Sequence, residues 1–235
     1  MDTQTRYALK HDTFVDTTNS TLEWIQNNLK LVIRYAILAV VVIAIILAIV
    51  VHFETRNADA QAMLNRAMNV YNTPLKQPDM PAEANIGSYA TEQDRASAAY
   101  PLFEKTANEY GSTRPGQDAR YFAGLTQIAL NNTSQAEQEL KQAVSGNDNI
   151  AALAKMALAG LAIQTGRGSD AVALYQQVIA HPTSTISAST AQIALAEYYE
   201  NNDVEQAKQI LAKVVDQNKN NAAGEIAQQD LAKLK

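Results

Sequence analysis

The longest apolar run of the chain, "LVIRYAILAVVVIAIILAIVV", extends from Leu31 to Val51, and residues 35–51 carry no charge, glycine or proline. As a helix these 21 residues would extend about 31 Å, which matches a hydrocarbon core of about 30 Å. A buried core helix is disfavoured, because the run has no polar face to present to water. Arg34 lies one turn inside the run, and its long stem can reach the headgroups. The pattern predicts a transmembrane helix.

The run is predicted to remain as an anchor, because the 30 residues before it are longer than a signal-peptide n-region and "VVHFETRN" after it lacks an A-x-A cleavage site. The chain has no cysteine that could carry a lipid. Basic residues are more numerous toward the N-terminal side of the run than beyond its C-terminal end, namely Arg6, Lys10, Lys30 and Arg34 against Arg56 and Arg66. This bias favours a cytoplasmic N-terminus and an exported C-terminal part.

The flanks of the run have helical patterns of their own. Ser20 precedes Glu23 at a capping-box spacing, and we favour the first turns of the membrane helix over a separate interfacial helix. After the run, an apolar stripe predicts that the helix continues unbroken to about Asn72; the stripe comprises Ala58, Ala62, Met63, Ala67, Val70 and Tyr71. Prolines at 74, 78 and 81 then predict a long loop.

Beyond Thr91 the sequence repeats about every 36 residues. Alanines recur at spacings of 37, 35 and 36, and each is followed four residues later by a large apolar residue; the pairs are Ala99/Phe103, Ala136/Leu140, Ala171/Tyr175 and Ala207/Leu211. A small residue precedes three of these alanines by eleven or twelve positions, at Gly124, Gly160 and Ala196. This pattern predicts stacked helical hairpins in which small residues permit close approach and the large residue fills the groove between hairpins.

The unit resembles the tetratricopeptide repeat, which has small residues at its eighth and twentieth positions and a bulky one at its twenty-fourth. The residues that match, and that we expect to pack the repeats, are Gly124, Ala136, Leu140, Gly160, Ala171, Tyr175, Ala196, Ala207 and Leu211. The chain departs from the pattern at Arg120, where the repeat has a bulky apolar residue, and keeps its closing proline only loosely, at 115 and 182. In the junction "YGSTRPG", Gly111 is expected to form a left-handed cap and Pro115 to begin the next helix.

Composition and motifs exclude several classes of function. The net charge of −5 lies entirely outside residues 1–52, which argues against nucleic acid as a partner. The three histidines, at 11, 52 and 181, have no metal-ligand spacing. The glycine pair in "TGRGSD" lies between two predicted helices and not after a strand. We therefore expect no catalytic residues, no cofactor, no metal and no enzymatic activity.

Tyrosine is unusually frequent, with ten residues against four phenylalanines. The first helices line the concave surface in tetratricopeptide arrays, and an amphipathic, stiff tyrosine there suits a peptide groove as well as packing between repeats. The predicted partner groove comprises Tyr121, Gln127, Lys155, Gln192, Tyr198 and Tyr199.

One anchor followed by a degenerate array resembles the bacterial ancillary SecYEG translocon subunit family (YfgM-like). The resemblance implies a single-pass protein of the bacterial inner membrane with a periplasmic scaffold. Its partners would be the translocon, a periplasmic chaperone or emerging polypeptides. The alternative is a self-assembling structural protein, a homo-oligomer built from the anchor helix and the array, with a small face at Ala58, Ala62 and Ala67.

The predicted class is therefore all-α, with a single N-terminal transmembrane helix followed by a tetratricopeptide-like α-solenoid. The expected segments are a disordered cytoplasmic arm (1–20), the anchor helix (21–53), a helix extension with a proline-rich loop (54–91), the repeats (92–221) and a C-terminal capping helix (222–235).

Overall fold

The computed structural model describes residues 24–77 and 87–234, and all regular elements among them are helices. The chain divides into two compact units, Met1–Thr55 and Arg56–Lys235. The predicted disordered arm and the Ser20/Glu23 capping box lie outside the described residues.

The first unit contains the apolar run. Residues 24–27 are helical, Asn28 forms a turn, and α2 then extends over Leu29–Tyr71. The predicted start of the anchor helix at residue 21 lies outside the described residues. At the turn the Trp24 carbonyl accepts from both the backbone N–H and the side-chain amide of Asn28, each at 2.9 Å. The apolar stretch of α2 is long and apolar enough to cross a membrane by length and composition, and none of it is buried.

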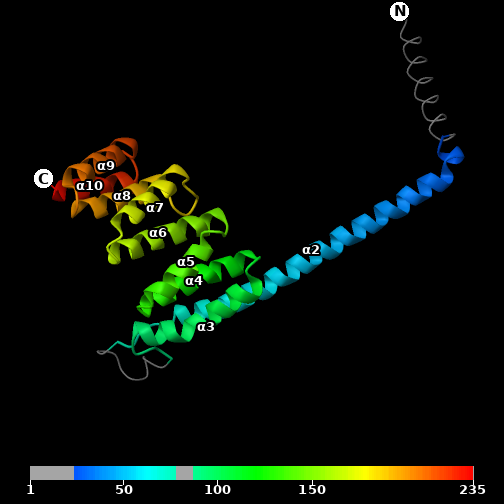
Figure 1. Ribbon diagram of the computed structural model, residues 1–235, viewed down its shortest axis with the longest axis horizontal. Coiled ribbons are helices and arrows are strands. Elements are labelled where there is room, and N and C mark those ends of the chain that lie inside the picture. Colours follow the sequence, from blue (N-terminus) through cyan, green and yellow to red (C-terminus); the bar gives the residue numbers. More distant parts are fainter. Residues whose placement is uncertain (1–23, 78–86, 235) are drawn as a thin grey trace, which may run out of the picture. The chain divides into compact units, whose positions relative to one another are not determined.

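The second unit is an array of antiparallel helical hairpins in chain order (Figure 1). The last turns of α2 pack with α3, α4 with α5, α6 with α7 and α8 with α9, while α10 covers the end. The helices are α3 (Glu92–Tyr110), α4 (Arg114–Ala129), α5 (Thr133–Ala143), α6 (Asp148–Gln164), α7 (Gly168–Ala180), α8 (Ala188–Glu200), α9 (Val204–Gln217) and α10 (Ala222–Lys233).

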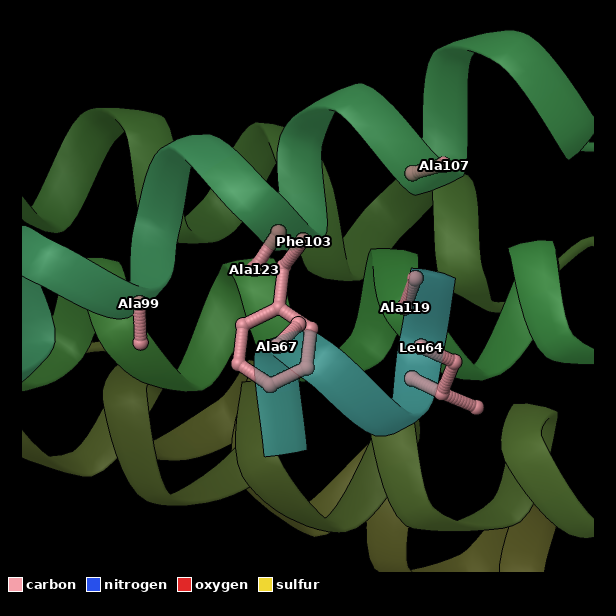
Figure 2. Packing of buried hydrophobic residues seen from close by; sticks show 7 residues of the cluster. All are labelled: Leu64, Ala67, Ala99, Phe103, Ala107, Ala119 and Ala123. Carbon is pink, nitrogen blue, oxygen red and sulfur yellow. The ribbon is translucent and has the colours of Figure 1, made fainter. Parts of the chain in front are cut away.

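The C-terminal turns of α2 act as the first helix of the first hairpin. Leu64 and Ala67 are buried against Phe103 of α3 and Ala123 of α4, and Figure 2 shows these side chains around the Phe103 ring. The predicted stripe is wrong in part, because Ala58 and Ala62 are exposed. The buried face comprises Ala60, Leu64 and Ala67 at helical spacing. Because alanines occur on all sides of this segment, the sequence did not show which face of the helix is buried.

Side-chain caps define where the repeat helices begin. Thr91 and Asp94 form a reciprocal capping box at α3, and Asn147 accepts from the Ile150 amide at α6. Pro101 lies inside α3 and removes one helical donor, and its would-be partner is the carbonyl of Ser97, an exposed residue that water can reach. Side-chain capping hydrogen bonds thus fix where these helices begin, and burial of apolar residues determines which face of each helix points inward.

The α3–α4 junction corrects one prediction. Gly111 has φ −57° and ψ −20°, so it caps α3 in the right-handed region and forms no left-handed cap. Pro115 does lie in the first turn of α4, after the N-cap Thr113. The glycine that the turn requires is Gly116, because a Cβ atom there would collide with the carbonyl of Tyr110.

Candidate functional site

The repeat markers lie at the junctions between helices. Ala99, Ala136, Ala171 and Ala207 are all fully buried. The four large residues that follow them are buried too, with Phe103, Leu140 and Leu211 fully enclosed and Tyr175 nearly so. In each hairpin a large side chain at this position therefore fills space beside small ones, as close packing requires.

The small residues of the first helices differ in their surroundings. A Cβ atom on Gly124 would lie 2.7 Å from Cγ of Leu140, so glycine permits that helix contact. Ala196 is fully buried. A Cβ atom on Gly160 would meet nothing within 4 Å, so the close-approach argument does not apply there. Its neighbour Ala159 is the fully buried small residue of α6.

Arg120 replaces an apolar residue with a polar bridge. Its side chain is only 18% exposed and links three helices through its two terminal nitrogens. Nη1 donates to Glu139 Oε2 (3.1 Å) and Gln142 Oε1 (2.7 Å) of α5, and Nη2 donates to the Ala107 carbonyl of α3 (3.1 Å). These bonds satisfy a partly buried guanidinium, which explains how the packing tolerates it.

A second polar bridge joins two neighbouring hairpins. Arg167, in the α6–α7 turn, donates through both terminal nitrogens to the Glu137 carboxylate of α5, at 3.0 and 2.8 Å. Lys141 Nζ lies 2.7 Å from the same carboxylate. The hydrogen bonds from Arg167 and then Lys141 lower the pKa of Glu137 from 4.5 to about 2.

The structure does not place the predicted groove residues on one accessible surface. Gln127 is only 2% exposed, and its Oε1 accepts from Asn132 within the α4–α5 hairpin, so it is closed to a partner. Tyr121 packs against the cluster that contains Leu140, and burial raises its pKa. Gln127 thus lies inside the α4–α5 hairpin, and the partner groove itself stays a prediction.

The remaining groove candidates lie on α6 and α8. Tyr199 packs beside the cluster that contains Tyr175, and its ring centre lies 5.3 Å from that of Tyr198. Gln192 and Tyr198 are half-buried on α8. Lys155 is half-buried on α6 and is the one predicted groove residue that lines a cleft.

This cleft lies in the second unit. It has a volume of about 970 Å³ and opens to solvent between the starts of α4 and α6 and the α7–α8 turn. Polar, charged and apolar residues all line its walls. The lining residues include Arg114, Asp118, Asp148, Asn149, Ile150, Lys155, Val178, His181, Pro182 and Ser184.

The two acidic groups of the cleft differ in environment. Burial raises the pKa of Asp118, although the Asn147 amide and the Arg114 charge act in the opposite direction. Asp148 is exposed in the first turn of α6, where a carboxylate suits the helix dipole. Neither forms a metal-ligand group, since no cluster of three His, Cys, Asp or Glu residues that could hold a metal occurs among the described residues.

Sequence reasoning missed most of this cleft. Arg114, Lys155 and His181 are separated by 41 and 26 residues and meet only because the hairpins stack. The signal that the sequence did offer was the place of each residue in its repeat. Arg114 and Lys155 lie on the first helices of two hairpins, and His181 follows the second helix of one, in the turn between hairpins.

The stacked hairpins define the class of the chain as a tetratricopeptide-like α-solenoid that follows one long apolar helix. No protein-family model matches the chain, and no curated protein does. A solved structure that it resembles is a putative kinesin light chain from Podosopora anserina, with nearly identical TPR-like repeats. The TM-score is 0.54 at 18% identity, and the match covers 76% of this chain and 85% of that chain. At this identity the likeness concerns the fold.

Proposed function

We propose that this protein is a scaffold for protein–protein interactions, anchored in the bacterial inner membrane, with its repeat array in the periplasm. The observation that carries the proposal is one chain with an exposed apolar helix of membrane-spanning length and a hairpin array with an open, polar cleft. The first feature gives attachment to a bilayer, and the second gives a surface for other proteins.

The proposed role is in secretion and folding beside the translocon. Support comes from the resemblance of the anchor-plus-array organisation to the ancillary translocon subunit family and from the basic residues before the apolar run. An array of this kind positions partners and needs no catalytic group. Its partners would be the translocon, a periplasmic chaperone or the emerging polypeptides.

Self-assembly has less support in the packing. Ala67 belongs to the first hydrophobic cluster, so the small face proposed for an oligomer is reduced to Ala58 and Ala62. We therefore propose no second function.

Two experiments test the proposal in sequence. A tag after Lys235 should be digested when protease is added to spheroplasts, and mild membrane solubilisation should then co-purify translocon subunits or a periplasmic chaperone. A protected tag would contradict the periplasmic placement. Digestion without recovery of either partner would contradict the translocon role and leave the anchor and its orientation standing.

A further inference from the structure

The N-terminal end of the apolar run carries two cations that lack a partner among the described residues. Lys30 and Arg34 lie in the first two turns of α2 and are exposed, and neither forms an ion pair or a side-chain hydrogen bond with a described residue. No aspartate or glutamate follows Arg34 along α2 until Glu54, twenty positions or about 30 Å of helix away. The described residues therefore leave both positive charges open to an external anion.

Arg34 is the cation with the greater need of a counter-charge. It lies three residues inside the apolar run that begins at Leu31, between Ile33 and Tyr35. A cation at this depth is costly unless its long stem carries the guanidinium outward to an anionic or hydrated layer. The planar guanidinium donors match two oxygens of a phosphate group, and phosphate is the anion that a phospholipid bilayer presents at its edge.

The aromatic side chains around the two cations indicate the level of lipid headgroups. Trp24 and Tyr35 lie on either side of the pair along the chain and are 55% and 63% exposed. Tryptophan and tyrosine are enriched where hydrocarbon meets water, because their rings are apolar and carry one polar N–H or O–H group. The headgroup layer is therefore the source of anions that Lys30 and Arg34 would meet first.

The helix face that carries the two cations continues as an apolar strip. Lys30 and Arg34 are one turn apart, and the same face continues through Ile37 and Val41, which are 59% and 47% exposed. A molecule that fits this face has an anionic head followed by a hydrocarbon tail. A phospholipid has this arrangement, whereas a free phosphate ion would use only the cationic end.

We propose that Lys30 and Arg34 form a headgroup site for an anionic phospholipid, whose phosphate they bind and whose acyl chain lies along Ile37 and Val41. A net negative headgroup is preferred, because a zwitterionic one brings its own cation beside the two basic side chains. This inference rests on the membrane anchor of the proposed function and adds a lipid preference to it. It does not depend on which side of the membrane the N-terminus occupies.

The test uses the only tryptophan of the chain, Trp24, which lies six residues before Lys30 and reports on lipid at this site. The full-length protein is placed in phosphatidylcholine nanodiscs that contain a small, equal fraction of a brominated lipid, either phosphatidylglycerol or phosphatidylcholine. Bromine near the headgroup end of the acyl chains quenches the fluorescence of Trp24 on contact. Quenching should reveal about a tenfold preference for phosphatidylglycerol, unchanged by millimolar inorganic phosphate at constant ionic strength.

Variants assign the preference to the two cations. Lys30→Gln and Arg34→Gln should each lower it about threefold, and the double variant should abolish it. The matched control is Arg66→Gln, which removes an exposed cation of the same helix within the second unit and should leave the preference unchanged. Lys30→Arg keeps the charge and should keep the preference. Carbonate extraction should leave all the variants in the membrane fraction.

Each other outcome overturns the inference. Equal quenching by the two lipids, or a full preference in the double variant, would remove the headgroup site and leave the anchor standing. Loss of the preference on addition of inorganic phosphate would assign the cations to soluble anions. Absence of quenching by both lipids would also remove the site, and extraction of the protein by carbonate would in addition contradict the anchor. Failure of the lipid site and failure of the proposed function are therefore read separately.

Discussion

The two units of the chain use apolar residues in opposite ways. In the apolar half of α2, large aliphatic side chains such as Ile43 and Leu47 are exposed on every side. In the array, alanine makes up more than half of the buried hydrophobic residues, and large side chains pack among the alanines. An apolar residue in the first unit serves contact with lipid, whereas one in the second serves contact between helices. Apolar content alone therefore predicts neither burial nor role.

The largest effect should come from placing charges in the apolar half of α2. The double variant Ile43→Arg with Leu47→Arg should prevent membrane integration, because each arginine at a helix centre costs about 2.5–3.5 kcal/mol on insertion scales. Carbonate extraction of membranes measures the effect. Asn69→Arg, on an exposed position of the same helix within the second unit, is the control and should stay membrane-bound. Retention of the double variant would contradict a membrane role for the run.

The next effect should come from removing a large buried side chain of the array. Phe103→Ala should lower the free energy of unfolding by about 3–5 kcal/mol, because it leaves a cavity among Leu64, Ala67 and Ala123. Chemical denaturation followed by circular dichroism measures it. Ile163→Ala, at a position 37% exposed, should cost less than about 1 kcal/mol. Equal costs would mean that the array does not depend on its buried large residues.

Two glycines of the first helices should respond differently to alanine. Gly124→Ala should lower the free energy of unfolding by about 1–3 kcal/mol, because the new Cβ would press on Leu140. Gly160→Ala should raise it by up to about 1 kcal/mol, because open space surrounds that position and alanine favours helix. Thermal melts of the two variants should therefore shift in opposite directions, and a shift in the same direction would refute the packing difference.

The smallest effect should come from the bridge between hairpins. The pKa of Glu137 is lowered from 4.5 to about 2, so its stabilisation is present above pH 4.5 and is lost as the pH falls through about 2. Because Arg167 and Lys141 are 40% and 65% exposed, solvent screening limits the contribution to about 1 kcal/mol. Glu137→Gln should remove it at pH 7 and reduce the loss of stability between pH 5 and pH 2. An unchanged pH dependence in this variant would exclude the bridge as its cause.

The repeat period and the fold class could be predicted from the sequence, because each hairpin places an alanine and a large residue at fixed spacing. The first helix of the first hairpin could not be predicted, because Leu64 lies among alanines that do not indicate which helix face is buried. The conformation of Gly111 was missed because Thr113 and Gly116 shape that junction. The cleft was missed for another reason. Arg114 and His181 are brought together by stacking, which no local pattern describes.

The hydrophobic clusters of the array join helices that are neighbours along the chain. Contacts of short sequence separation can form without closing long loops, which favours rapid folding. A hairpin can therefore pack on its predecessor as soon as it is available, and the order of folding can follow the order of synthesis. The first hairpins of the array can therefore fold before its C-terminal helices have been synthesised.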